Sequence, residues 1–159
     1  MMSQIGQYLR LAQGDIETFI GDPDEAFDTV DGMFESDDPR LVDIDQTWNA
    51  LAVLLRESGI SDAIIYGDEE LPGADEWGFT APRTLNPDRV RQFSENLSAL
   101  DPDGLVEGLD PAKFAEAKVY PVEIWPNVDQ DWLVGHLRAL IAFFQTAADE
   151  GMWVLTWRA

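Results

Sequence analysis

Two aspartates, Asp43 and Asp45, followed by Thr47, form the pattern in this sequence that is best suited to chemistry. In phosphatases with an Asp-x-Asp-x-Thr motif, the first carboxylate attacks phosphorus, the second acts as general acid and base, and a magnesium ion holds the phosphate. That reaction needs the motif to follow a buried strand, with a lysine and a further acidic pair on neighbouring strands. Here only two apolar residues precede the motif, and both lysines of the chain fall in or at the end of an expected helix.

A structural interpretation of the same residues is simpler. Asp45 stands where a helix is expected to begin, so its carboxylate would accept hydrogen bonds from the free N–H groups of the first turn. Asp43 would lie in the approach, where negative charge interacts favourably with the helix dipole. Apolar residues then recur from Trp48 onward at the spacing of one buried helix face, and Gly59 ends the helix. We therefore predict that both aspartates serve the helix start and not a reaction.

Few other catalytic or metal-binding schemes fit this composition. The chain has no cysteine, which excludes thiol chemistry, disulfide bonds and zinc–thiolate sites. Its single histidine, His136, is expected to be a packing or surface residue of a helix. The stretches that begin at Asp22 and Asp101 resemble pieces of a calcium loop, but they lack its spacing, and Asp-Pro is better explained as a helix start. We therefore predict no cofactor and no metal site.

The net charge of −21 is extreme and unevenly distributed. Residues 1–82 hold 19 acids and 3 bases, a net charge of −16, whereas residues 83–159 hold 12 acids and 7 bases, a net charge of −5. Nucleic acid and anionic membranes are poor partners for such a surface, because binding them requires a surplus of Lys and Arg. Cations and basic proteins are attracted instead. A second explanation is that the acidity serves solubility or reflects adaptation to salt or to a GC-rich genome.

The sequence predicts one α/β domain that spans residues 1–159, with a cytoplasmic location because neither a signal peptide nor a membrane helix is recognisable. The final strand, 152–157, is apolar on both faces, as a central strand covered on both sides would be. In the helix that starts at Pro23, residues 26, 27 and 30 are expected to face inward. The other expected elements are a strand at 5–12, extended chain at 77–85, and helices at 16–20, at 45–58, from Pro87, Pro102 and Pro111, and at 129–150.

Several short stretches, taken in order, resemble the YfbM-like family, a bacterial family catalogued as a domain of unknown function. They are Val42 to Trp48, Gly67 to Leu71, Leu85 to Val90, Phe114 to Trp125 with Val119-Tyr120-Pro121 inside it, and Phe143 to Gly151. The resemblance spans nearly the whole chain. It implies an α/β three-layer sandwich in a single domain, with a small mixed sheet and helices on both faces, and it implies no activity. Relatives tend to carry a histidine near Leu51 to Val53, and its absence here weakens an enzymatic interpretation.

Six tryptophans are available to line a ligand pocket, although such residues more often form the core. Trp77 is the exception, because it lies in an acidic, glycine-rich loop where an exposed aromatic side chain would suit an interface. The candidate binding residues combine the aspartate pair, three tryptophans and two members of the family-like stretches: Asp43, Asp45, Trp48, Gly67, Trp77, Tyr120 and Trp125.

The leading functional hypothesis is a non-catalytic interaction module whose acidic N-terminal half docks a more basic protein, with an aromatic anchor near Trp77. An immunity-type inhibitor of a basic toxin is one form of such a module. The alternative is a small-ligand-binding protein or a hydrolase that uses Asp43 and Asp45, together with Tyr120, in one cleft. A third hypothesis is a purely structural acidic subunit, and the sequence does not fix the oligomeric state.

Overall fold

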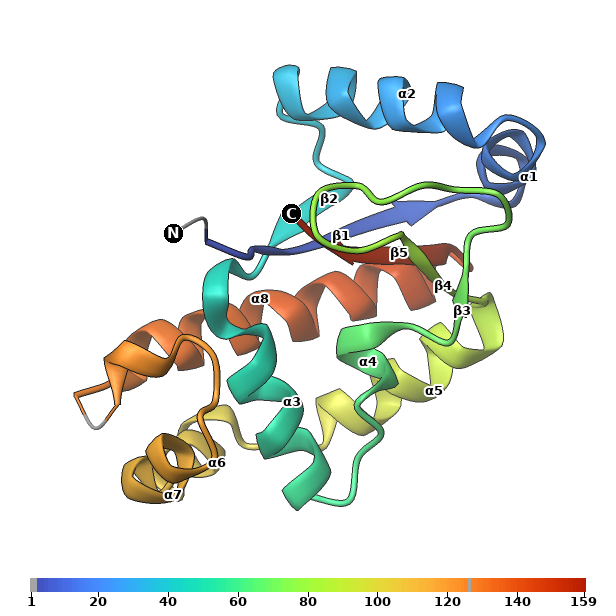
Figure 1. Ribbon diagram of the computed structural model, residues 1–159. Coiled ribbons are helices and arrows are strands. Elements are labelled where there is room, and N and C mark those ends of the chain that lie inside the picture. Colours follow the sequence, from blue (N-terminus) through green and yellow to red (C-terminus); the bar gives the residue numbers. More distant parts are fainter. Residues whose placement is uncertain (1–2, 126) are drawn as a thin grey trace.

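The computed structural model describes residues 3–125 and 127–159, and in this part of the chain five strands form one sheet in the order β2-β1-β5-β4-β3 (Figure 1). The strands are β1 (Gly6–Leu11), β2 (Leu41–Asp43), β3 (Glu69–Glu70), β4 (Arg83–Leu85) and β5 (Trp153–Arg158). Every ladder between these strands is antiparallel, which differs from the mixed sheet expected from the sequence. Two helices connect β1 to β2, and the chain returns beside β1 in the opposite direction, so the ladder between β1 and β2 is antiparallel.

Helices cover both faces of the sheet, as expected. Helices α1 (Gln13–Gly21) and α2 (Pro23–Glu35) lie on one face, which is the upper face in Figure 1, and the loop of residues 71–80 crosses that face beside α2. The elements on the lower side are α3 (Trp48–Glu57), α4 (Ala63–Tyr66), α5 (Pro87–Ser98), α6 (Pro102–Glu107), α7 (Pro111–Glu116), α8 (Gln130–Asp149) and the 3-10 turns η1 (Asp45–Thr47) and η2 (Val122–Ile124). No described helix combines the length and the apolar character that crossing a membrane requires.

Strand β5 is the central strand, as its two-sided apolar pattern predicts. It pairs with β1 along its whole length and with β4 on its other side. Leu155 and Trp157 belong to the core under α1 and α2, whereas Val154 belongs to the core on the opposite face. Successive side chains of β5 point to opposite faces of the sheet, so this strand contributes to both cores.

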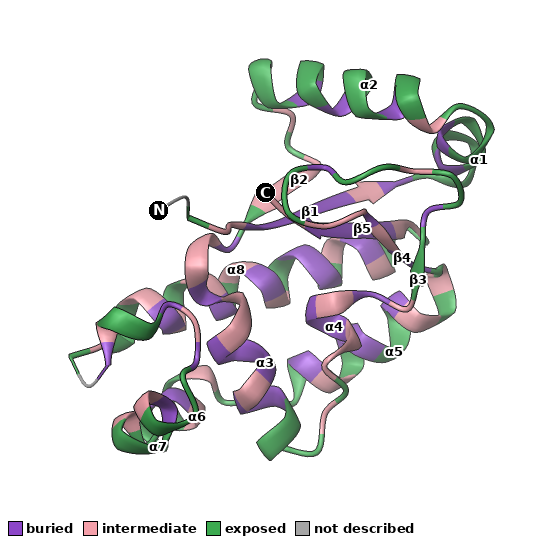
Figure 2. Cartoon of the chain, in the orientation of Figure 1, coloured by how far each residue is buried: buried purple, intermediate pink, exposed green. Residues whose placement is uncertain are grey.

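Two hydrophobic cores lie on the two faces of the sheet, and buried residues gather toward the sheet from both sides in Figure 2. In the larger, lower core, Phe93 of α5 and Phe144 of α8 are fully buried together with Tyr8 of β1, whose hydroxyl donates to the carbonyl of Ile64 at 2.8 Å. The smaller, upper core holds residues from α1, α2, the 71–80 loop and the sheet: Leu9, Leu11, Ile16, Phe19, Ala26, Val30, Met33, Leu71, Trp77, Leu155 and Trp157.

Proline begins four of the helices, as the sequence predicts. These first-turn prolines are Pro23, Pro87, Pro102 and Pro111. Asp22 caps α2 by accepting the N–H of Glu25 at 3.1 Å, and Asn86 caps α5 by accepting the N–H of Arg89 at 2.9 Å. The Asp22 cap fixes the residue at which α2 begins, and therefore which side chains of α2 face the sheet.

Candidate functional site

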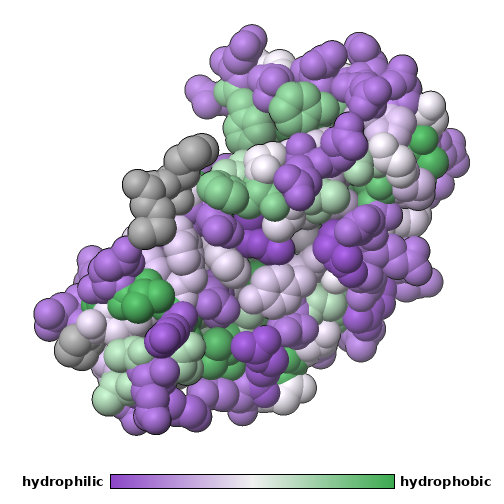
Figure 3. All heavy atoms as spheres, viewed as in Figure 1, coloured by the Kyte–Doolittle hydropathy of each residue, from purple (hydrophilic) through white to green (hydrophobic). Residues whose placement is uncertain are grey.

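A surface groove runs along α2, between this helix and the loop of residues 75–79, and continues to strand β2. Three adjoining hollows of 300, 220 and 380 Å³ make it up. The first two hollows share Phe27 and Trp77, and the second and third share Phe34. The three hollows therefore adjoin one another along α2, and together we call them the α2 furrow. In Figure 3, hydrophobic side chains gather beneath α2 and hydrophilic side chains surround them.

Four aromatic rings line the α2 furrow, together with smaller apolar side chains such as Val30 and Leu41. Trp77 and Trp157 meet edge to face with their ring centroids 5.1 Å apart. Phe27 packs against Trp77 at 6.0 Å, and Phe34 packs against Trp157 at 6.4 Å. Both tryptophans are buried, whereas Phe27 and Phe34 each leave 40% of their surface exposed. An exposed aromatic pair supported by buried rings is typical of a binding surface.

Carboxylates surround these rings. Residues 11–39 contain ten acids and no base, and residues 67–79 add five acids and no base. The acids that line the furrow are Asp24, Asp28, Asp31, Asp37, Asp38, Asp43, Asp75 and Glu76. Among the described residues, only Asp38 of this set has a salt bridge, to Arg40 at 2.9 Å. The furrow is therefore an apolar surface in a negative field, and that field attracts cations.

The pairing of Asp38 with Arg40 makes a pH-dependent contribution to stability. Hydrogen bonds from Arg40 lower the pKa of Asp38 from its ordinary 3.8 to about 2. Because the folded-state pKa is the lower one, the stabilisation is present above pH 3.8 and is lost as the pH falls toward 2. Asp38→Asn should therefore cost about 1 kcal/mol or less at neutral pH, and this deficit should vanish in acid. Urea unfolding at several pH values measures it. Asp37→Asn, which removes an exposed acid without an arginine partner, should show no such pH-dependent deficit.

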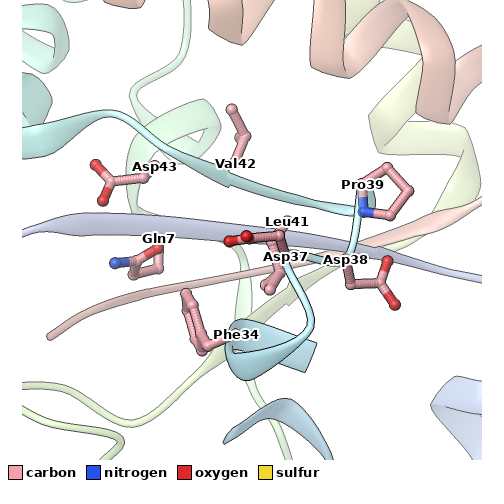
Figure 4. Close-up of a pocket in the computed structure, with 8 residues that line it drawn as sticks. All are labelled: Gln7, Phe34, Asp37, Asp38, Pro39, Leu41, Val42 and Asp43. Carbon is pink, nitrogen blue, oxygen red and sulfur yellow. The ribbon is translucent and has the colours of Figure 1, made fainter. Parts of the chain in front are cut away.

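A buried acceptor lies at the β2 end of the furrow. Gln7 is only 8% exposed, and its side-chain Oε1 is buried and accepts no hydrogen bond from the described residues. Gln7 stands between Asp43 and Trp157 across the sheet, and Figure 4 shows its amide and the ring of Phe34 within the same hollow. A buried acceptor without a donor costs about 1–3 kcal/mol, and a ligand N–H would remove that cost.

The sequence of α2 explains how the two exposed phenylalanines arise. Ala26, Val30 and Met33 form the buried stripe of this helix. Phe27 and Phe34 are seven residues apart, which places them one above the other on a neighbouring stripe. The expectation that Phe27 faces inward is therefore wrong. The sheet below α2 covers only the stripe of Ala26, Val30 and Met33, and Phe27 lies beside that stripe.

The loop that carries Trp77 is attached to strand β5. The N–H of Phe79 donates to the carbonyl of Arg158 at 2.9 Å. Gly78 has φ +108°, and a methyl group there would lie 2.6 Å from the Cα of Ala159. Only glycine permits this approach. The close approach of this loop to the end of β5 holds Trp77 over Trp157, so Trp77 is only 4% exposed. The expected exposed aromatic in this loop is thus not Trp77, which Phe27 and Trp157 cover.

Asp43 and Asp45 lie between β2 and α3 and accept hydrogen bonds from nearby backbone N–H groups. Asp43 is exposed at the end of edge strand β2, and its Oδ1 accepts the N–H of Asp45 at 2.6 Å. Asp45 accepts the N–H of Gln46 at 2.8 Å and the indole N–H of Trp132 at 3.1 Å. The 3-10 turn η1 intervenes before α3 begins at Trp48, so the specific prediction that Asp45 caps this helix is wrong. Among the described residues, no three acidic or histidine side chains gather where they could hold a metal ion.

Trp48 and Tyr120 lie on the opposite face of the sheet from the furrow. Their rings stack at 5.2 Å with 25° between the planes. Gln4 joins them, because its carbonyl accepts the indole N–H of Trp48 at 2.9 Å and its N–H donates to the hydroxyl of Tyr120 at 2.7 Å. The candidate residues therefore do not form one cleft: Asp43 and Trp77 line the furrow, and Trp48 and Tyr120 belong to a second cluster.

Gly67 ends α4 and brings the chain against the sheet. It has φ +75° and ψ 172°, and a methyl group there would lie 2.6 Å from the Cβ of Arg83. We expect Gly67→Ala to cost at least about 2 kcal/mol, because both the backbone conformation and the space require glycine. Gly14→Ala is the matched comparison, since nothing lies within 4 Å of its new methyl group. Chemical denaturation of both variants measures the difference, and equal stabilities would contradict this role for Gly67.

Two further residues singled out from the sequence have structural surroundings. Trp125 is 7% exposed, packs edge-on against Phe114 at 5.1 Å and donates its indole N–H to the carbonyl of Val119 at 2.8 Å. His136 is half-buried on α8, with its ring 6.1 Å from that of Trp132. Both positions are those of packing side chains.

Sequence reasoning missed Phe34 and Gln7. The signal for Phe34 was available, because it follows Phe27 by seven residues in a segment without a base. No local signal pointed to Gln7, since its burial comes from the pairing of β1 between β2 and β5 and from the helix above.

Comparison with known proteins identifies the family. The model of a domain of unknown function (DUF1877) matches residues 2–157. The crystal structure of YfbM from Escherichia coli, a protein of unknown function, is similar with a TM-score of 0.70 and 19% sequence identity, covering 98% of this chain and 99% of that chain. At this identity the likeness establishes the fold, and no curated protein matches the sequence. The chain belongs to the DUF1877 family, as its resemblance to YfbM-like proteins predicts.

Proposed function

We propose that this protein is an interaction module and that the α2 furrow binds a basic, partly apolar segment of another protein. The observation that carries the proposal is the pair of exposed rings, Phe27 and Phe34, in a groove whose acids, apart from Asp38, have no salt bridge among the described residues. A groove of this kind offers apolar contact and negative charge in one place. Lys and Arg side chains suit both, because their stems pack on rings while their charged ends reach carboxylates.

The dimensions of the furrow set the length of the segment. Helix α2 has 13 residues and is therefore about 20 Å long. An extended segment of about six residues, or a helix of about 13, spans that distance. Two apolar side chains of the segment would contact Phe27 and Phe34, with basic residues between and beside them. An N–H donor at the β2 end would satisfy the Oε1 of Gln7.

The two kinds of contact act on different rates. The negative field of α1, α2 and residues 67–79 would speed the arrival of a basic partner and make the association rate sensitive to salt. The aromatic rings would slow dissociation, because buried aromatic anchors supply most of the binding energy of such interfaces. Carboxylate variants should therefore change the association rate, and ring variants should change the dissociation rate.

A random peptide library selected on the folded protein tests the proposal. The enriched peptides should carry Lys or Arg interspersed with apolar residues, and they should compete with one another for one site. Selection on the Phe27→Ala/Phe34→Ala variant should not enrich them. Peptides without a basic bias, or peptides enriched equally on the variant, would overturn the proposal.

Charge-neutral variants separate the furrow from the general acidity of the protein. Asp28→Asn/Asp31→Asn removes two carboxylates that line the furrow. Glu107→Gln/Glu116→Gln removes the same charge from exposed positions on α6 and α7. The furrow variant should slow association of a selected peptide several-fold more than the comparison variant at low salt. Equal effects would show that only the net charge matters.

A further inference from the structure

Arg158, at the end of β5, differs from every other arginine of the chain. The other seven each have a carboxylate oxygen within 4.0 Å. Among residues 3–125 and 127–159, no carboxylate pairs with Arg158 and no group accepts a hydrogen bond from its guanidinium, although the chain holds 31 acids. The guanidinium lies instead over two aromatic rings, with its carbon 5.0 Å from the ring centre of Trp48 and 5.1 Å from that of Tyr66.

The surroundings of Arg158 withdraw it from water without neutralising it. The residue is half-buried on the lower face of the sheet, away from the α2 furrow. Burial lowers the pKa of this guanidinium, while the hydroxyl groups of Tyr66 and Tyr8 act in the opposite direction and Arg83 lowers it further. Contact with two aromatic faces offsets only part of the desolvation, about 0.5–2 kcal/mol. A half-buried cation in this state is stabilised further by an anion.

The hydroxyl of Tyr66, beside Arg158, is a hydrogen-bond donor with capacity to spare. The hydroxyl of Tyr66 accepts from Asn49 Nδ2 at 3.5 Å, which leaves its own proton for an acceptor. Arg83 is engaged by Glu70 at 4.0 Å and by the backbone carbonyl of Asp68 at 2.6 Å. The carboxylate of Asp68 pairs with Arg89 at 2.9 Å, so neither acid pairs with Arg158. A guanidinium that lies over two aromatic rings, one of which carries a phenol proton, offers the donors that recognise an oxyanion.

We propose that Arg158, in contact with the rings of Trp48 and Tyr66, binds the carboxylate group of a small organic acid. The planar guanidinium matches a carboxylate with two parallel N–H···O bonds, and the hydroxyl of Tyr66 donates to the same group. Phosphate shares this chemistry, but the net charge of −21 repels an anion in proportion to its charge, which favours a monoanion. The rings of Trp48 and Tyr66 beside the guanidinium favour an acid with an apolar body, such as benzoate, over acetate. This site is separate from the furrow, so its test does not depend on the proposed function.

Titration of the wild-type protein with benzoate, acetate and inorganic phosphate tests this site, followed through the Nε–Hε NMR signal of Arg158 at constant ionic strength. The signal is assigned by its loss in Arg158→Lys. Benzoate should produce a saturable shift at lower concentration than acetate or phosphate, and sodium chloride should produce none. A response indistinguishable from that of chloride, or tighter binding of phosphate, would overturn the proposal.

Variants identify the groups responsible. Arg158→Lys keeps the charge but loses the planar fork, and it should weaken benzoate binding at least tenfold as measured by the shifts of the Trp48 indole N–H. Tyr66→Phe keeps the ring but removes the donor, and it should weaken binding several-fold with an unchanged fold in the NMR spectrum. Arg138→Lys, at an exposed position on α8, should leave the affinity unchanged. Benzoate affinity that survives both Arg158→Lys and Tyr66→Phe would contradict the assignment.

Discussion

Replacing both Phe27 and Phe34 by alanine should weaken binding of a selected basic peptide by about 2–3 kcal/mol, which is roughly 30- to 150-fold. Both rings are 40% exposed and point into the α2 furrow, so their loss removes the apolar anchors of the proposed partner. The stability of the protein should change much less, because neither side chain is part of the upper core. Calorimetric titration of the peptide and urea unfolding of the variant measure the two effects.

A matched variant shows whether the effect belongs to the furrow. Val122 is 49% exposed in η2, on the side of the sheet opposite α2. Val122→Ala should leave peptide affinity unchanged. If the double phenylalanine variant binds as tightly as the wild type, or if Val122→Ala loses as much affinity, the furrow is not the binding surface.

Removing the ring that supports the furrow should have the largest effect on stability. Trp157 is 3% exposed on central strand β5 and contacts both Trp77 and Phe34. We expect Trp157→Ala to cost about 3–5 kcal/mol, because it leaves a cavity between α2, the 71–80 loop and the sheet. Chemical denaturation measures this loss.

A conservative change distinguishes packing from other causes. Trp157→Phe keeps an aromatic ring in the upper core and should cost clearly less than Trp157→Ala. The alanine variant should also lose the near-ultraviolet dichroism that arises from the packed Trp77. A loss below about 1 kcal/mol for Trp157→Ala would contradict the role of this ring in joining the loop to the sheet.

The fold was predictable where local chemistry determines it. The pattern Asn86-Pro87 specifies both a cap and a first helical residue, and α5 begins there. The apolar character of both faces of β5 indicated a central, covered strand, and β5 lies between β1 and β4. The structural need for Gly67 and Gly78 was not predictable, because the close approaches that require glycine involve Arg83 and Ala159, which lie outside the local sequence of each glycine.

The candidate site was less predictable, because it depends on which face of the sheet each residue reaches. Asp43 and Asp45 are two residues apart, yet Asp43 faces the furrow and Asp45 accepts a hydrogen bond from Trp132 of α8. Trp77 carried the right signal for an interface, but tertiary packing buries it and exposes Phe27 instead. The missing salt bridge of Arg158 is invisible in a sequence with 31 acids, since only the fold decides which of them reach it.

Mapping of a selected basic peptide onto the protein by amide and indole NMR shifts tests the central claim most directly. If the α2 furrow is the binding surface, the largest changes should fall on α2, on residues 75–79, on β2 and on the indole N–H signals of Trp77 and Trp157. Changes concentrated on α5 to α8, or spread evenly over all acidic surfaces, would contradict it.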